Sequence, residues 1–245
     1  MTRASPGPRS RTASAVSPGR GPLGPGFDAV ALAVGRALLA LLGLALLWSI
    51  GARVARRFLR FPTPAFVGAL LDSPFRRALQ PPEEVLAPLG IAPGMTVLEL
   101  GPGPGTYTIE AARQASPGGR VIAADAQAGM LARLSHKVRR LGITNVELRL
   151  ADAYHLPLPD QSVDVAFMVT VLAEVPDRER ALAEVRRVLR PGGLLGVSEF
   201  LPDPDYPRRA TVRRWATAVG FQPEREAGGC LWYVLTFRKP GPEGE

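Results

Sequence analysis

The chain has 245 residues, enough for one α/β domain of about 150–200 residues together with an appendage. Its formal net charge is +8, but residues 1–77 hold 11 Arg and 2 Asp while residues 78–245 are close to neutral. This distribution argues against a nucleic-acid partner and favours a membrane surface, with simple solubilising charge as the alternative. Cys230 is the only cysteine, so one chain cannot build a disulfide framework or a multi-cysteine metal site, and we predict no metal.

The N-terminal third divides into three segments. Residues 1–26 are rich in Pro, Gly, Ser and Arg and predict a disordered tail, because they offer little to bury. Residues 27–51 predict a hydrophobic helix that associates with a membrane through residues 29–50, a stretch of about 22 residues, where about 20 are needed to span a bilayer. A spanning helix is the expectation, and an interfacial helix, a signal peptide and a buried core helix are the alternatives. Residues 52–82 form a basic, proline-containing connector that fits a cytoplasmic flank.

Residues 83–240 read as one α/β domain, followed by a short tail over residues 241–245. Short apolar runs alternate with amphipathic stretches, which is the pattern of βαβ units and a parallel sheet. The predicted strands are Thr96–Leu100, Val121–Asp125, Val146–Leu150, Val163–Val169, Leu194–Phe200 and Leu231–Phe237. The predicted helices are Thr106–Ala115, Ala128–Leu141, Arg178–Leu189 and Thr211–Val219.

A glycine-rich turn follows the first predicted strand, in the sequence VLELGPGPGTYT. Gly101, Gly103 and Gly105 allow a tight turn and a close approach of backbone to a ligand, and the helix that follows offers free N–H groups. The spacing is G-x-G-x-G, unlike the G-x-G-x-x-G of dinucleotide sites. Glu99 would repel a pyrophosphate but suits a ligand with an ammonium or sulfonium charge. A purely structural turn is the alternative.

Two acidic residues stand at the ends of later strands. Asp125 ends the second predicted strand about 20 residues after the glycine turn, where a carboxylate can accept hydrogen bonds from both ribose hydroxyls. Taken alone, such an Asp is as often a helix N-cap. Asp152 follows the third strand and can accept a hydrogen bond from an exocyclic adenine amine. The combination predicts a site for a nucleoside-containing ligand.

Four segments in chain order carry a family resemblance: VLELGPGPG, VIAADAQAGML, ADAYHLPLPDQSVD and RVLRPGGLLGVSEF. They resemble the successive motifs of class I S-adenosylmethionine-dependent methyltransferases, in particular the ubiquinone/menaquinone-biosynthesis-like branch, over about residues 80–240. The resemblance implies a Rossmann-like, seven-stranded and mostly parallel sheet whose last strand is antiparallel, with flanking helices and S-adenosylmethionine as cofactor. It places Glu99, Gly101, Gly103 and Thr170 at the methionine side, Asp125 at the ribose, Met130 near the adenosine, and Asp152 with Ala153 at the adenine.

The sequence departs from this family after the fourth strand. Many relatives resemble V-L-H-E-[VI]-P-D, whereas this chain reads VLAEVPD with Ala173 at the histidine. Methyl transfer is an in-line displacement in which orientation supplies much of the rate, so a general base is needed only for some acceptors. We name Glu199 as the candidate catalytic base. It is chosen from a set that also contains Glu174, Asp203, Asp205 and Tyr206, with His155 as a weaker candidate.

These observations predict methyl transfer to a small, lipid-like acceptor, either a quinone precursor or a phospholipid amine, because a membrane segment would raise the local concentration of such a molecule. The protein is expected to be membrane-associated with its catalytic domain in the cytoplasm, where the family uses S-adenosylmethionine. One alternative is a membrane-anchored S-adenosylmethionine-binding module without turnover. The other is a nicotinamide oxidoreductase, which Glu99 and the glycine spacing disfavour. The sequence does not predict an oligomeric state.

Overall fold

The computed structural model describes residues 74–201, 203 and 205–241, with residues 30, 32–37, 39–40, 43–44, 47 and 51 upstream. The chain forms two compact units, residues 1–48 and residues 49–245. The described residues between 30 and 51 are helical, and within the described part of the chain no helix is both long and apolar enough to cross a membrane. Much of the predicted membrane helix, the tail over residues 1–26 and residues 52–73 of the connector lie outside the described residues.

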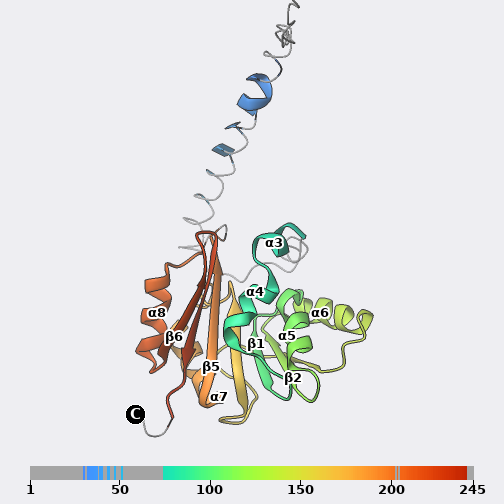
Figure 1. Cartoon of the computed structure of the whole chain (residues 1–245), viewed down its shortest axis with the longest axis vertical. Coiled ribbons are helices and arrows are strands. Elements are labelled where there is room, and N and C mark those ends of the chain that lie inside the picture. The colour runs from blue at the N-terminus through green and yellow to red at the C-terminus, as the bar shows by residue number, and fades with distance from the viewer. Residues whose placement is uncertain are drawn as a thin grey trace, which may run out of the picture. The chain divides into compact units, whose positions relative to one another are not determined.

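The larger unit is built on a seven-stranded sheet (Figure 1) with the order β3-β2-β1-β4-β5-β7-β6. The strands are β1 (Thr96–Leu100), β2 (Arg120–Asp125), β3 (Val146–Leu150), β4 (Val163–Val169), β5 (Leu189–Phe200), β6 (Gln222–Gly228) and β7 (Trp232–Arg238). β7 runs antiparallel to both β5 and β6, and the remaining pairs are parallel. The predicted mostly parallel sheet with an antiparallel last strand is confirmed.

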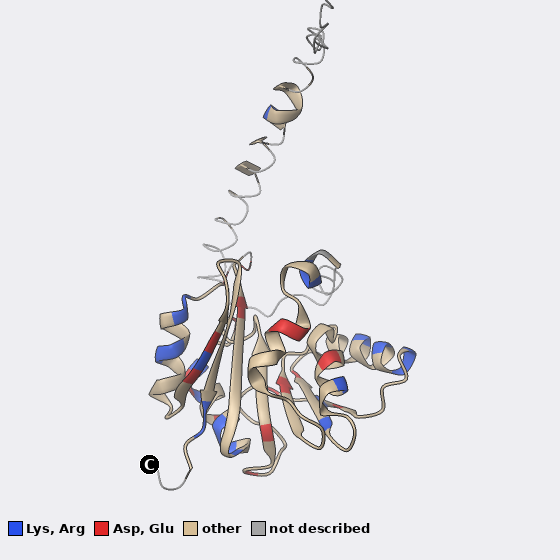
Figure 2. Ribbon diagram, in the orientation of Figure 1, with Lys and Arg blue, Asp and Glu red and all other residues tan. Residues whose placement is uncertain are grey.

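Helices cover both faces of the sheet and create two main hydrophobic layers. The helical elements are α3 (Pro74–Leu79), α4 (Pro82–Leu86), the 3₁₀ turn η2 (Ala87–Leu89), α5 (Thr106–Ala115), α6 (Ala128–Arg140), α7 (Arg178–Val188) and α8 (Arg209–Ala218). Residues of α4 and α5 pack with Val97, Val121 and Val165 on one face. Residues of α7 and α8 pack with Leu98, Ala166 and Val197 on the other. Basic side chains lie along α6 and α8 (Figure 2).

Two stretches of the sheet differ from the hydrophobicity-based prediction. β5 begins at Leu189 instead of Leu194, because Leu189 pairs with Val163 before Arg190–Gly193 step out of register. β6 is absent from the predicted strands, since its sequence QPEREAG is polar and contains a proline. It lies at the edge of the sheet with an irregularity between Pro223 and Arg225, which is where such a sequence is tolerated.

The end of the predicted connector belongs to the folded domain. α3 lies within residues 52–82, yet Arg76 is only 9% exposed and Gln80 is fully buried. The Gln80 side chain donates to Ser198 Oγ at 3.0 Å and accepts from the Tyr107 hydroxyl at 2.9 Å. Residues 74–80 therefore close one side of the domain before α4 begins.

Candidate functional site

A cavity of about 300 Å³ opens at the carboxyl ends of the parallel strands. The segments that follow β1, β2, β3 and β4 all contribute to its wall, and α3 adds Arg76. Seven of the residues predicted from the sequence line it: Gly101, Gly103, Asp125, Met130, Asp152, Ala153 and Thr170. The three others, Glu99, Gly105 and Glu199, are not among its lining residues.

The three glycines of the turn have positive φ angles, but their surroundings differ. At Gly103 an added Cβ would meet nothing within 4 Å, so this backbone faces open space in the cavity. At Gly105 an added Cβ would lie 2.3 Å from Leu134 Cδ1. Gly103 therefore leaves room for a ligand, whereas Gly105 allows α6 to pack closely where α5 begins.

Asp125 closes β2 at the cavity wall and is 8% exposed. Its Oδ1 accepts the backbone N–H of Gln127 at 2.9 Å. Burial raises the pKa of Asp125, and backbone hydrogen bonds from Gln127, Gly103 and Ala126 oppose that rise. The N-cap of α6 is Gln127, which makes no side-chain cap, so Asp125 does not occupy the capping position considered above. Its carboxylate instead joins the glycine turn to the end of β2.

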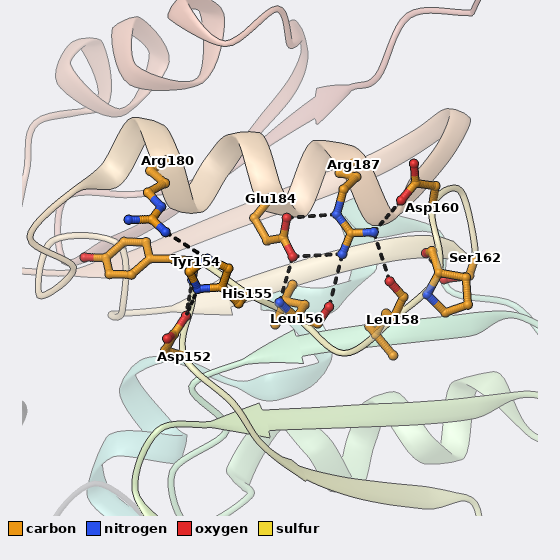
Figure 3. Close-up of polar contacts among 11 residues, drawn as sticks. Asp152, Tyr154, His155, Leu156, Leu158, Asp160, Ser162, Arg180, Glu184 and Arg187 are labelled. Atoms are coloured by element: carbon orange, nitrogen blue, oxygen red, sulfur yellow. Dashed lines mark hydrogen bonds and ion pairs between the residues drawn. The ribbon is translucent and has the colours of Figure 1, made fainter.

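Asp152 lies in the loop after β3, in a small polar group that faces α7 (Figure 3). Its Oδ1 accepts the Tyr154 N–H at 2.7 Å and lies 3.5 Å from His155 Nδ1. The Tyr154 N–H, and then the His155 N–H, lower the pKa of Asp152. His155 Nε2 is 2.9 Å from the Arg180 guanidinium of α7. His155 therefore contacts Asp152 and α7, and it is not among the residues that line the cavity.

Arg187 fixes the same loop to α7 (Figure 3). Its guanidinium donates to the carbonyl oxygens of Leu158 at 3.0 Å and Leu156 at 3.1 Å, and it also pairs with Asp160. Glu184, one turn earlier on α7, accepts the Leu156 N–H at 2.7 Å and binds Arg187 at 2.8 Å. A loop without regular structure thus receives fixed partners for its backbone, and these place Asp152 and Ala153 at the cavity.

Glu99 is 2% exposed, and its Oε2 accepts a hydrogen bond from the Thr108 hydroxyl of α5. Burial raises the pKa of Glu99 to about 8, and the Thr108 hydrogen bond opposes the rise. A carboxyl group with such a pKa carries its proton at neutral pH. The structure therefore places Glu99 between β1 and α5, behind the glycine turn.

Arg76 and Thr170 form a contact that the sequence does not predict. Arg76 Nη2 donates to Thr170 Oγ1 at 3.0 Å, and its guanidinium lies 5.3 Å from the Phe200 ring centroid. Thr170 has φ 55°, which is unusual for a β-branched residue, and such strain is commonly found at binding sites. Arg76 carries no recognisable signal, because α3 is a six-residue helix with no hydrophobic period.

The candidate bases occupy the β4–β5 side of the site. Glu174 and Asp203 line the cavity, whereas Glu199 is 1% exposed at the end of β5. Burial, with Asp203 and then Glu174, raises the pKa of Glu199 well above its ordinary value. Tyr206 packs edge-on against Tyr233, with 5.5 Å between ring centroids.

Residues 98–197 match the family model described as a methyltransferase domain. The chain is 37% identical over 117 residues to an arsenite methyltransferase of Halobacterium salinarum, a match that covers 48% of this chain and 30% of that protein. It is 41% identical over 112 residues to a ubiquinone/menaquinone biosynthesis C-methyltransferase UbiE of an Enterobacter species, covering 45% of each. The chain thus spans less than half the length of these curated relatives.

A solved structure from Aquifex aeolicus, titled a SAM-dependent methyltransferase, superposes with a TM-score of 0.69 at 28% identity. The superposition covers 73% of this chain and all of that one. The glycine turn and the acidic strand ends described above lie within residues 98–197, which match the methyltransferase domain model. Over residues 98–197 the chain is therefore similar to class I S-adenosylmethionine-dependent methyltransferases, and it resembles the UbiE proteins among them.

Proposed function

We propose that this chain binds S-adenosylmethionine in the cavity and directs its methyl group to a small acceptor. The observation that carries the proposal is the convergence of the glycine turn, Asp125 and Asp152 on one cavity at the carboxyl edge of the sheet. In sheets of this kind, ligands bind at that edge. The family match over residues 98–197 supports the same reading.

The residues of the cavity fit the cofactor. The open space beside Gly103 leaves room for a part of the cofactor that any side chain at this position would exclude. Asp125 offers a carboxylate to the ribose hydroxyls. Asp152 and Ala153 would hold the adenine, and Met130 would pack against the adenosine. Thr170 and Arg76 would lie at the methionine end. When bound, the cofactor supplies a methyl group activated by its sulfonium charge.

The chain contributes orientation to this reaction. Three features fix sides of the cavity before a ligand arrives. They are the loop after β3, which Arg187 holds, the strained backbone of Thr170 and the buried Asp125. Preorganised positioning of two reactants supplies much of the rate of a displacement that needs no covalent intermediate. Where the acceptor must lose a proton, Glu199 at the end of β5 is the candidate base, and burial raises the pKa of this carboxyl well above its ordinary value.

The acceptor is proposed to be lipid-like and to be met at a membrane surface. The apolar stretch over residues 29–50, the Arg excess of residues 1–77 and the similarity to UbiE proteins support this, with the catalytic domain on the cytoplasmic side. Trivalent arsenic, the substrate in the name of another relative, is a soft centre that prefers several thiolates. The chain has only Cys230.

Two experiments test these proposals. S-adenosylmethionine and S-adenosylhomocysteine should raise the melting temperature while NAD should not. A ligand that binds only the folded state adds about 2.7 kcal/mol to the free energy of unfolding at a hundredfold excess over Kd. Equal shifts with NAD would contradict the cofactor assignment.

A carbonate wash of membranes from cells that make the full chain should leave it in the pellet, whereas an interfacial helix would be released. Recovery in the soluble fraction before any wash would contradict both membrane readings.

A further inference from the structure

Helix α6 carries basic side chains on its outer face and no acidic ones (Figure 2). Its sequence is AGMLARLSHKVRR, and no Asp or Glu stands between Asp125 and Glu147. The buried positions of the helix are Met130, Leu131, Leu134 and Val138. The exposed positions of its second half, which we call the α6 basic face, are Arg133, His136, Arg139 and Arg140. Arg133, His136 and Arg140 recur at the spacing that aligns side chains along one stripe of a helix.

The arginines of the α6 basic face lack the ion pairs that are common elsewhere in the domain. The pairs outside α6 include Arg113–Glu110, Arg120–Glu147, Arg149–Glu147, Arg187–Glu184, Arg209–Glu226, Arg213–Glu226 and Arg238–Glu224. By contrast, Arg133, Arg139 and Arg140 make no ion pair with any residue that the structure describes. A helix dipole favours cations in the last turn, which accounts for Arg139 and Arg140 but not for Arg133. The fold itself therefore does not explain the whole face.

This local charge contrasts with the charge of the domain as a whole. Residues 78–245 hold 19 Lys and Arg against 20 Asp and Glu, and four of these 19 lie on α6. A nearly neutral domain attracts a free polyanion in solution only weakly, because opposite charges cancel beyond the Debye length of about 10 Å. The α6 basic face acts most strongly where another part of the chain already holds the domain close to an anionic surface.

Leu141 adds an apolar side chain to this face. It follows Arg140 directly and is 46% exposed. Arginines with an adjoining leucine suit the surface of an anionic bilayer, where the arginines bind lipid phosphate and the leucine reaches the boundary of the acyl chains. A nucleic acid offers the same phosphate groups but no acyl chains to cover Leu141. The chemistry of the face therefore favours a lipid surface.

We propose that the α6 basic face, together with Leu141, docks the domain on a bilayer surface that contains anionic phospholipid. This inference rests on the proposed membrane association and adds the surface of the domain that meets the lipid. The same helix begins at the cavity, where Gln127 and Met130 belong to the lining. A domain that lies on α6 therefore keeps the carboxyl edge of its sheet beside the lipid, from which a lipid-like acceptor enters.

The first test measures the accessibility of each arginine in the full chain. The protein is incubated with preformed vesicles of phosphatidylcholine, with or without phosphatidylglycerol, and treated with phenylglyoxal, which modifies exposed guanidinium groups. Peptide mass spectrometry then gives the labelling rate at each position. With phosphatidylglycerol the rates at Arg133, Arg139 and Arg140 should fall about fivefold, the weight of one basic residue at an anionic surface. High salt should restore them, because it screens the attraction.

Arg214 of α8 provides the control within the same sample. It is exposed and makes no ion pair with the described residues, but α8 covers the opposite face of the sheet from α6. Its labelling rate should be the same with both lipids. Equal protection of Arg214 would show a general effect of the vesicles and would overturn the inference.

The second test compares two variants that lose the same charge. Arg133→Gln/Arg139→Gln/Arg140→Gln alters the α6 basic face, and Arg113→Gln/Arg120→Gln/Arg213→Gln alters paired positions elsewhere. In flotation with phosphatidylglycerol vesicles, the first variant should need roughly tenfold more lipid for half-maximal binding, while the second should stay close to the wild type. None of these residues lines the cavity, so S-adenosylhomocysteine should stabilise both variants as it does the wild type.

The outcomes separate this inference from the proposals on which it rests. A full chain that does not float with phosphatidylglycerol vesicles would overturn both the inference and the membrane proposal. Floated protein whose α6 arginines react as fast as with phosphatidylcholine, or equal weakening of the two variants, would overturn the inference alone. Protection of the α6 arginines by transfer RNA but not by vesicles would show a nucleic-acid surface and overturn the lipid assignment.

Discussion

At the scale of single residues, two of the buried carboxyl groups at and behind the cavity wall, Asp125 and Glu99, have different partners. Asp125 receives backbone N–H groups from three residues and lines the cavity. Glu99 receives one hydroxyl, from Thr108, and lies behind the cavity wall. Hydrogen bonds to the charged form oppose the effect of burial, so Asp125 is the better placed of the two to present a carboxylate to a ligand.

Replacing Asp125 by Asn should weaken S-adenosylhomocysteine binding by about 1.5–3 kcal/mol, the range for a hydrogen bond with a charged partner. The amide keeps the size of the side chain and one oxygen for the Gln127 N–H, so the melting temperature without ligand should change little. Isothermal titration measures the affinity, and circular dichroism checks the fold. An unchanged affinity in a folded variant would show that Asp125 does not contact the ribose.

Glu99 should make the stability of the protein depend on pH. Because its pKa rises from 4.5 to about 8 on folding, the folded state holds a proton that the unfolded state has lost in this window. Its burial is therefore harmless below pH 4.5 and increasingly destabilising as pH rises toward 8. Glu99→Gln should match the wild type at pH 5 and exceed it by about 1–4 kcal/mol at pH 8 in urea unfolding. A constant difference between the two proteins across this range would refute the raised pKa.

At the scale of elements, the loop after β3 depends on one residue of α7. The carbonyl groups of Leu156 and Leu158 both accept from Arg187, which is itself held by Glu184. The loop places Asp152 and Ala153 at the cavity wall, so α7 supports this side of the cavity although Arg187 itself does not line it. Support of this kind fixes the residues that contact a ligand.

Arg187→Met should lower the free energy of unfolding by about 1–3 kcal/mol, because partly buried carbonyls lose their donor. Cofactor affinity should fall as well, since the loop that carries Asp152 becomes mobile. Chemical denaturation and titration with S-adenosylhomocysteine measure the two effects. The exposed Arg133 of α6 gives a matched control, and Arg133→Met should change neither quantity. Wild-type affinity in a destabilised Arg187→Met variant would separate the loop from the site.

At the scale of the whole molecule, the larger unit begins well before the motif-bearing region. The unit spans residues 49–245, whereas the family match begins at residue 98. The buried Arg76 and Gln80 belong to this additional part and contact Thr170 and Ser198. The segment before β1 is therefore part of the wall around the cavity.

Two truncated chains test this boundary. A chain of residues 49–245 should be soluble and should bind S-adenosylhomocysteine as the full chain does, because it retains the whole unit. A chain of residues 81–245 should be less stable and bind the ligand more weakly, because it loses Arg76 and Gln80. Thermal unfolding with and without ligand compares them. Equal behaviour of the two would show that α3 is dispensable.

The sequence by itself determined six of the seven strands and one half of the cavity wall, the glycine turn with Asp125 and Asp152. Fully buried parallel strands such as β1 and β4 are short apolar runs, and the turn after β1 requires glycines, so both are visible locally. Tertiary structure alone decided the other half. Arg76, Glu199 and Glu174 are far apart in sequence and approach one another only because β4 and β5 are neighbours and α3 folds back over their ends. The edge strand β6 was likewise decided by pairing with β7, since backbone hydrogen bonds form there whatever the polarity of the side chains.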